Sequence, residues 1–559
     1  MHNNFIKISQ QDWMSQTSTK LGKRSTRYEA SSLSCFRSTL EIDYDIYNKV
    51  KNEIYNKNLP KKWQRKSRIK ESKKPINDQN FQNLYSYPCF CGIPVSVNSY
   101  FNYDDFYEQA NCAVTYYGRT NASDEPYQRG RTMFEKMWTK KLPKGINMIE
   151  HQVNKIMIYE FLPVGFSKKT KADKYDIPLM IYWHGGGGVF RRPNKEYVRF
   201  LGRLAEVLKI RVVAPAYDRA PEIIFPNGIG DAVDACIDFL RGTYDQSATM
   251  RQPFNPQKFF LGGDSGGTLG VNLLLHMLAS DENLSSKFKP FATIVNTSAS
   301  NSCFYDFPSY HDVKALRGMT LARKHYFQNC HINGLEFVRH CRGVESTNSA
   351  SSASKFDGGA YCENHYQYTI GLGLAQNEEC KHLFNLEAYD MEKYLPNEFR
   401  TGPYKVDNSE LYHKKYNREQ HKKDLEANAN LNLPKWIFSE IENHNKKGLQ
   451  DFRSNFFNAG KDILLNIVRA FPNNVFYFSA AEYDIFRDEG VMFGNRLVEL
   501  GANVMIEVVD RVLHSYPVYS KFMGGFNRSF DAETLVWITN IGYLIEMNSV
   551  DQENKGSVL

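Results

Sequence analysis

Short, almost continuously apolar runs recur in two separate parts of the chain, each bounded by polar or glycine-rich sequence. They occupy residues 177–183, 258–261, 291–296, 474–480 and 504–509. Apolar runs without alternation are typical of strands that are buried on both faces of a parallel sheet. The pattern therefore predicts a parallel sheet whose strands come from both parts of the chain.

Segments with helical spacing lie between these runs. The expected helices cover residues 231–240, 268–279 and 491–500, and edge strands are expected around residues 152–162. Regular alternation of strands and helices favours an α/β architecture, in which helices cover a mostly parallel sheet. The pattern is inconsistent with two antiparallel β-barrels.

A glycine-framed serine follows the run at 258–261. Ser265 stands in the sequence Gly263-Asp264-Ser265-Gly266-Gly267, between an expected strand and an expected helix. Glycines two positions before and after a serine let a strand and a helix cross closely, so that the hydroxyl projects above the sheet. Ser265 is therefore the candidate nucleophile.

A second glycine-rich stretch, His184 followed by four glycines, comes directly after the run at 177–183. Attack on an acyl carbonyl places negative charge on its oxygen, and glycines can turn several N–H groups toward that charge. We expect the backbone N–H groups of Gly186, Gly187 and Gly266 to form the oxyanion hole. The alternative interpretation of residues 184–188 is a glycine-rich turn that ends a strand.

An acid and a histidine follow the last two apolar runs. Asp484 lies four residues after one run, and His514 lies just past the next. The carboxyl ends of parallel strands share one edge of a sheet, so both residues are expected beside the nucleophile. Glu482 and Asp488 are rival acids, although Asp488 is better explained as a helix-start residue that satisfies free N–H groups.

Taken together and in this order, the motifs resemble the hormone-sensitive-lipase branch of the α/β-hydrolase superfamily, which includes arylacetamide-deacetylase-like esterases. A Tyr-x-x-Ala-Pro-Glu segment that begins at Tyr217 adds to the resemblance, which covers residues 145–300 and 470–540. It implies an α/β-hydrolase fold with a mostly parallel central sheet, an N-terminal extension and a large cap or regulatory insertion.

The resemblance also implies a serine ester hydrolase. Ser265 would be the nucleophile, His514 the general base and then acid, and Asp484 the group that fixes the imidazole tautomer. No metal or organic cofactor is needed, and the expected partner is a small ester or acyl-lipid substrate. The chain departs from the family at Gly266, where alanine is usual, and at Ser515-Tyr516, where Gly-Phe is common and a different pocket wall is expected.

Other functional interpretations remain open. An amidase or deacetylase would use the same three side chains, and a hydrolase fold can also serve as a non-catalytic receptor or interaction module. The Gly-Asp-Ser-Gly-Gly sequence also occurs in trypsin-like proteases. Those enzymes place the serine after the histidine and the aspartate, whereas Ser265 precedes both here.

The chain has 559 residues with a net charge of +8, and residues 60–75 carry most of that charge, with eight Lys/Arg against one Glu. Upstream, Ile42, Ile46, Val50 and Ile54 recur at spacing four within an expected amphipathic helix at 40–57. A solvated linker is the favoured interpretation of the basic run, and docking of the apolar stripe and basic run on an anionic membrane is the alternative. No nucleic-acid motif accompanies the run, so nucleic-acid binding is not expected.

Ten widely spaced cysteines include no CxxC pair, which argues against zinc sites and favours free thiols. The chain starts without the basic and apolar segments of a secretory signal, and no apolar stretch is long enough to span a bilayer. We therefore expect a cytoplasmic protein, with peripheral contact to a membrane or lipid droplet as an open alternative.

Four regions are expected along the chain. Residues 1–80 form a polar, partly disordered extension. Residues 81–300 form the first part of the core with N-terminal cap elements, for which the aromatic-rich sequence at 81–145 is the candidate, although these aromatic residues could equally pack in the core. Residues 301–465 form a cap or insertion with a Ser-rich stretch at 345–354 and a Lys/Asn-rich one at 412–430. Residues 466–559 complete the core.

Overall fold

The computed structural model describes most of the expected core and part of the remaining chain. Its described residues are 35–40, 42–58, 131–132, 135–136, 138, 141–166, 169–170, 174–188, 190–219, 222–223, 227–242, 254–298, 309, 385–396, 399, 452–453, 456–484, 486–525 and 530–556. The basic run at 60–75, the aromatic residues expected in a cap between 85 and 116, and the stretches at 345–354 and 412–430 lie outside them.

The described residues form one mixed sheet of nine strands in the order β1-β9-β8-β7-β6-β4-β5-β3-β2. The six central strands, β9, β8, β7, β6, β4 and β5, are parallel to one another. At one edge β1 pairs antiparallel with β9, and at the other β3 pairs antiparallel with β5 and β2 with β3. Their bounds are Cys35–Ser38 (β1), Ile146–Val153 (β2), Ile156–Pro163 (β3), Leu179–Trp183 (β4), Arg211–Pro215 (β5), Phe259–Ser265 (β6), Ala292–Ser298 (β7), Val475–Tyr483 (β8) and Asn503–Leu513 (β9). The predicted α/β-hydrolase architecture with a mostly parallel sheet is confirmed.

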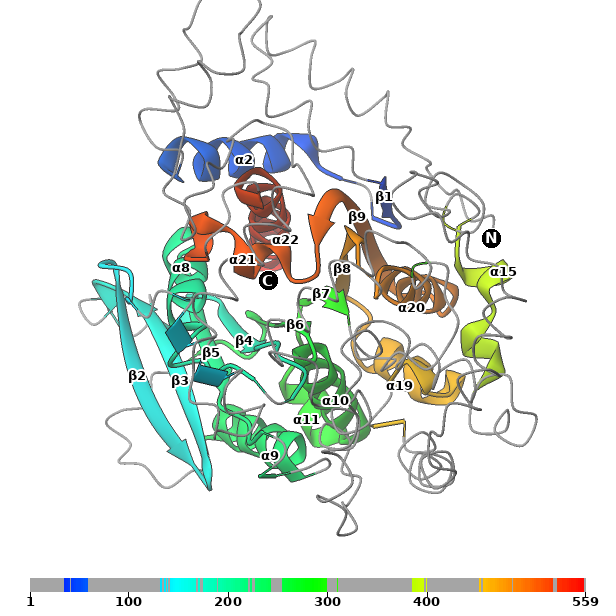
Figure 1. Ribbon diagram of the computed structural model, residues 1–559, viewed down its shortest axis with the longest axis horizontal. Coiled ribbons are helices and arrows are strands. Elements are labelled where there is room, and N and C mark those ends of the chain that lie inside the picture. The colour runs from blue at the N-terminus through cyan, green and yellow to red at the C-terminus, as the bar shows by residue number, and fades with distance from the viewer. Residues whose placement is uncertain are drawn as a thin grey trace, which may run out of the picture.

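Helices cover both faces of the sheet (Figure 1). Along β4, Leu179, Ile181 and Trp183 point into one core cluster, and Met180 and Tyr182 point into the other, because side chains alternate along a strand. The helices of the first cluster are α9 (Asn227–Arg241), α10 (Gly267–Ser280), α19 (Lys461–Ala470) and α20 (Arg487–Glu499). Those of the second are α2 (Tyr44–Asn58), α8 (Val198–Leu208) and α22 (Asp531–Gly556).

Part of the expected N-terminal extension packs on the core. Strand β1 pairs with β9, and helix α2 lies against α22. The apolar stripe of α2, including Ile46, Val50 and Ile54, packs against the second core cluster. The suggestion that this stripe docks on a membrane is therefore wrong, because α22 covers the same side chains. None of the described helices is both long and apolar enough to cross a bilayer.

The described pieces of the expected insertion contact α20. Asn495 of α20 donates to the backbone carbonyl of Tyr394 in α15 (Met391–Tyr394), and Arg496 donates to the carbonyl of Ala459. Helix α19 spans the expected boundary at residue 465. The division of the chain into four regions stays a prediction.

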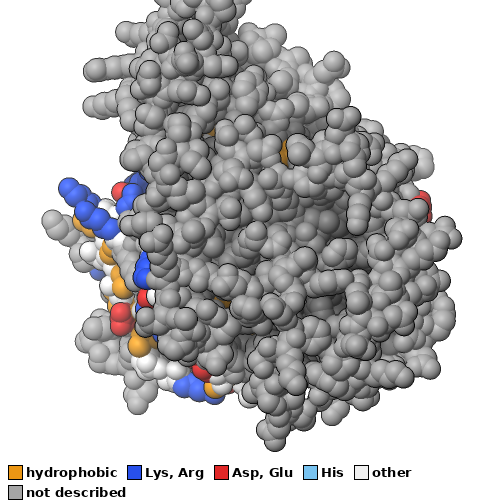
Figure 2. Space-filling view, in the orientation of Figure 1, with side chains coloured by type: hydrophobic (Ala, Val, Ile, Leu, Met, Phe, Trp, Pro, Cys, Tyr) orange, Lys and Arg blue, Asp and Glu red, His pale blue; other side chains and the backbone are white. Residues whose placement is uncertain are grey.

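The surface of β2 and β3 carries a mixture of side chains. Hydrophobic, basic and acidic side chains of described residues are visible at this side of the molecule in Figure 2. In strand β2, Ile146, His151 and Val153 are buried whereas Asn147, Glu150 and Gln152 are exposed, as expected for an edge strand with one solvated face.

A buried carboxylate on β9 makes stability depend on pH. Glu507 accepts hydrogen bonds from Tyr477 Oη at 2.5 Å and from Asn540 Nδ2 at 3.0 Å, and burial raises its pKa to about 7. The folded state therefore holds a proton that the unfolded state releases near the ordinary carboxyl pKa. The free energy of unfolding should therefore fall as the pH rises from the ordinary carboxyl pKa to about 7.

We predict that Glu507→Gln stabilises the protein at pH 8 relative to the wild type, by up to about 3 kcal/mol, and changes little at pH 5. The amide removes the ionisation and keeps an acceptor for Tyr477. Urea unfolding at both pH values measures the difference, and Glu282→Gln, on the exposed side of helix α11 (Glu282–Lys287), is the matched control. An equal effect of Glu507→Gln at both pH values would contradict the prediction.

Candidate active site

Ser265 lies at the sharp turn between β6 and α10. Its φ is 52°, a left-handed conformation that is strained for a residue with a side chain. A Cβ atom on Gly267 would lie 2.3 Å from the carbonyl oxygen of Trp183, and one on Gly263 would lie 2.8 Å from Val271 Cγ2. Glycine at both positions is what allows β6, α10 and β4 to approach so closely, as the sequence motif predicts.

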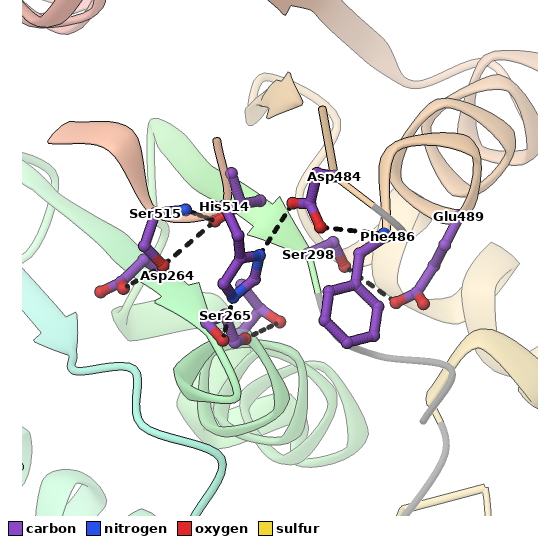
Figure 3. Close-up of polar contacts among 10 residues, drawn as sticks. Asp264, Ser265, Ser298, Asp484, Phe486, Glu489, His514 and Ser515 are labelled. Carbon is purple, nitrogen blue, oxygen red and sulfur yellow. Dashed lines mark hydrogen bonds and ion pairs between the residues drawn. The ribbon is translucent and has the colours of Figure 1, made fainter. Parts of the chain in front are cut away.

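The structure brings Ser265, His514 and Asp484 together. The distance from His514 Nε2 to Ser265 Oγ is 2.6 Å, and the distance from His514 Nδ1 to Asp484 Oδ2 is 2.8 Å. Figure 3 shows the three side chains pointing toward one another from the ends of β6, β9 and β8. This arrangement gives the serine hydroxyl a proton acceptor and gives the imidazole an orienting carboxylate.

The carboxylate of Asp484 is fixed on its other side as well. Asp484 is buried, and its Oδ1 accepts a hydrogen bond from the backbone N–H of Phe486 at 3.0 Å. The Phe486 ring lies 5.2 Å from the His514 ring, so it borders the imidazole (Figure 3). His514 therefore has both a polar and an apolar neighbour that limit its rotation.

The rival acids have other positions. Asp488 accepts from Arg487 Nε at 2.8 Å and from the backbone N–H of Ser309 at 2.6 Å. The expectation that Asp488 satisfies free N–H groups at the helix start is wrong, because the buried guanidinium beside it needs a counter-charge. Glu482 lies within β8, where its carbonyl accepts from Arg487 Nη1 at 3.3 Å.

Residues 184–188, here called the glycine loop, leave the end of β4 beside the nucleophile turn. Gly186 and Gly187 have φ values of 126° and 62°, which suit glycine. A Cβ atom on Gly266 would lie 3.0 Å from Gly187 N, so the loop and the turn are in close contact. The three glycines expected to form an oxyanion hole are thus neighbours, and their role as donors stays a prediction.

His184 anchors this loop from inside the protein. Its ring stacks on that of Tyr217 with centroids 4.2 Å apart, and Tyr217 Oη donates to the His184 carbonyl oxygen at 2.8 Å. Burial lowers the pKa of His184 to about 3, so the imidazole is neutral. Its Nδ1 lies 2.9 Å from the carbonyl oxygen of Gly185, which fixes the start of the loop.

Asp264, next to the nucleophile, links the parts of the site. Its buried carboxylate accepts from Gly185 N at 3.2 Å, Tyr182 Oη at 2.9 Å, Tyr197 Oη at 2.7 Å and Ser515 Oγ at 3.1 Å. One carboxylate therefore holds both the glycine loop and the residue after His514. This role of Asp264 could not be predicted from the sequence, because most of its donors are distant in sequence.

Ser515 and Tyr516, the residues after His514 that depart from the family pattern, both lie inside the protein. Ser515 has a φ of 55°, and besides the bond to Asp264 its backbone N–H donates to Thr297 Oγ1 at 3.3 Å. Tyr516 is buried, and its hydroxyl lies 3.0 Å from Ser479 Oγ. The expectation that Tyr516 alters the pocket wall is wrong, because its ring packs in the core.

We predict that Asp264→Asn slows covalent modification of Ser265 by a fluorophosphonate by about 10- to 100-fold. An amide nitrogen would face donors that need an acceptor, and displacement of the reacting groups by even 1 Å can slow a reaction by about two orders of magnitude. Time-resolved mass spectrometry of the labelled protein measures the rate. Asp281→Asn, which keeps the cap of helix α11, is the matched control, and an unchanged rate in Asp264→Asn would refute the linking role.

Comparisons with known proteins agree with this fold. Residues 180–327 match a family described as having the alpha/beta hydrolase fold. Over 121 residues the chain is 31% identical to "Probable carboxylesterase 6" of Arabidopsis thaliana, a match that covers 22% of this chain and 35% of that protein. The chain thus spans about a third of the length of the curated relative that it matches.

Solved structures provide two further similarities. One is an esterase from the bacterial hormone-sensitive lipase family, with a TM-score of 0.41 and 14% identity, covering 79% of this chain and 97% of that one. Another is the ester-hydrolase EH1AB1 from the metagenome of Lake Arreo, with a TM-score of 0.42 and 15% identity, covering 79% and 96%. The matched family and the order of strands agree on the alpha/beta hydrolase fold for residues 180–327 of this chain.

Proposed function

We propose that this protein is a serine hydrolase that cleaves carboxylic esters through an acyl-enzyme intermediate. The observation that carries the proposal is the continuous hydrogen-bonded series from Ser265 Oγ through His514 to Asp484, with distances of 2.6 and 2.8 Å. The name of the Arabidopsis relative, a probable carboxylesterase, supports the same reaction class. The substrate would be a small ester or an acyl lipid.

In the first half of the reaction, Ser265 Oγ attacks the ester carbonyl carbon while His514 Nε2 accepts the hydroxyl proton. Negative charge develops on the carbonyl oxygen, where the N–H groups of Gly186, Gly187 and Gly266 would stabilise it. His514 then returns the proton to the departing alcohol as the C–O bond breaks. The acyl group remains on Ser265.

In the second half, water replaces the alcohol. His514 accepts a proton from the water as it attacks the acyl carbon, and the carboxylic acid leaves when Ser265 regains its proton. Asp484 keeps the Nδ1 proton of His514 in place throughout, so that Nε2 faces the serine. The buried position of Asp484 favours this role, because a buried carboxylate interacts strongly with the imidazolium that forms.

We predict that Ser265→Ala lowers kcat for p-nitrophenyl esters by about 1000-fold or more and abolishes fluorophosphonate labelling, because the nucleophile is lost. A panel of acyl chains from two to sixteen carbons, with matched anilides, measures the activity and identifies the preferred acyl length. Ser286→Ala changes an exposed serine of α11 and serves as the control. A wild-type protein that is neither labelled nor active would favour the receptor alternative, and preference for the anilides would favour the amidase alternative.

A second prediction distinguishes the candidate acids. Asp484→Asn should lower kcat by about 1000-fold or more, because an amide no longer stabilises the productive tautomer and the imidazolium. Glu482→Gln should lower kcat by less than about 10-fold, since Asp484 Oδ2 rather than Glu482 lies 2.8 Å from His514 Nδ1. Steady-state kinetics on one ester compares the two variants, and a larger loss in Glu482→Gln would overturn the assignment.

A further inference from the structure

The loop that follows β5 lies against the glycine loop. Tyr217 in this segment bonds and stacks with His184, and two residues later Arg219 places Nη1 3.5 Å from the carbonyl oxygen of Arg191. Strands β4 and β5 are parallel neighbours, so both loops leave the same edge of the sheet as the turn at Ser265. Arg219 therefore belongs to a loop that leaves the same edge of the sheet as the glycine loop and the turn at Ser265.

Arg219 is a largely buried cation without an ion-pair partner among the described carboxylates. The negative charges that reach it belong to Glu222 and Glu196. Glu222 forms two hydrogen bonds with Arg131, at 2.5 and 2.9 Å, and Glu196 accepts from the backbone N–H of Arg192 at 2.8 Å. Both carboxylates are thus engaged elsewhere, and most donors of the Arg219 guanidinium have no described acceptor.

Among the charged groups described around this loop, the cations outweigh the carboxylates in their effect on Arg219. Burial, followed by repulsion from Arg131 and Arg192, lowers the pKa of Arg219 to about 10, so the guanidinium still carries its charge at neutral pH. These cations also act on the glycine loop. Arg219, Arg191 and Arg192 lower the pKa of His184 in addition to the lowering by burial.

Within the part of the chain that the structure describes, other charged groups nearby do not balance this excess. Asp218 is exposed, and its charge contributes to raising the pKa of Lys155. Lys195 is paired with Glu135. A guanidinium that has no ion-pair partner among the described residues is expected to be stabilised by a bound anion, and its planar donors match a carboxylate in a two-bond arrangement.

We propose that Arg219 binds a carboxylate of the ester substrate, so that the enzyme prefers esters with a negative charge. The inference rests on the proposed hydrolase function and adds a class of substrate to it. Neighbouring strands lie about 4.8 Å apart, so β5 is roughly 10 Å from β6 and its nucleophile. A carboxylate a few carbon atoms from the scissile ester would therefore reach Arg219.

Two sets of paired substrates test whether the charge lies on the acyl or the alcohol side. The acyl set compares p-nitrophenyl monoesters of dicarboxylic acids of four to eight carbons with neutral acyl esters of equal length. The alcohol set compares 3- and 4-acetoxybenzoate with phenyl acetate. For each pair, the readout is the ratio of kcat/KM for the charged ester to that for the neutral ester.

We expect Arg219→Gln to lower this ratio by about 10- to 100-fold in at least one set, as loss of a charge-assisted hydrogen bond predicts. Arg219→Lys should retain part of the ratio, because it keeps the charge but not the planar donors. Arg241→Gln, at the end of α9, is the control. The melting temperature of Arg219→Gln should not fall, because the lost cation is repelled by its neighbours.

A binding measurement separates this proposal from the hydrolase function. Calorimetry on Ser265→Ala, with and without Arg219→Gln, gives the affinity for the charged esters when no turnover occurs. Weaker binding in the double variant supports the carboxylate site even if the wild type hydrolyses nothing, an outcome that would refute only the hydrolase function. A ratio within about 2-fold of the wild type in both sets, or equal binding by the two variants, overturns the proposal.

Discussion

A single buried carboxylate next to the nucleophile connects the two loops on which the site depends. Asp264 accepts hydrogen bonds from Gly185 in the glycine loop and from Ser515 beside His514, in addition to two tyrosine hydroxyls. Burial of this charge is favourable only while its donors stay in place. Any movement of the glycine loop or of the histidine loop away from Ser265 would leave the carboxylate short of donors, so its burial favours the assembled site.

The parallel sheet makes this arrangement possible. Strands β4, β6, β8 and β9 bring to one edge residues that lie far apart in the sequence, and each loop continues directly from its strand. The glycines of the nucleophile turn permit the close contact between β6, α10 and β4. Ser265 accepts a strained φ of 52° within this packing, and the energy of the surrounding contacts maintains it.

Much of this could be predicted from sequence because the signals are local. The glycine frame around Ser265, the four glycines after His184 and the apolar runs before Asp484 and His514 each reflect a short-range requirement. The strands predicted from the five apolar runs begin within two residues of β4, β6, β7, β8 and β9, whereas β1, β5, α8, α19 and α22 were not predicted. The interactions of Asp264 and Ser515 could not be predicted, because their partners meet only after the sheet has formed. The same reason explains why the packing of the α2 stripe could not be predicted, since its partner α22 lies at the other end of the chain.

The central claim is that nucleophile, base and oxyanion donors converge on one reacting carbonyl group. A crystal structure of the protein after reaction with an alkyl phosphonate tests it most directly. The account predicts phosphorus bonded to Ser265 Oγ, with the phosphoryl oxygen about 2.7–3.1 Å from the backbone nitrogens of Gly186, Gly187 and Gly266. Phosphorus on another side chain, or a phosphoryl oxygen turned away from these nitrogens, would contradict it.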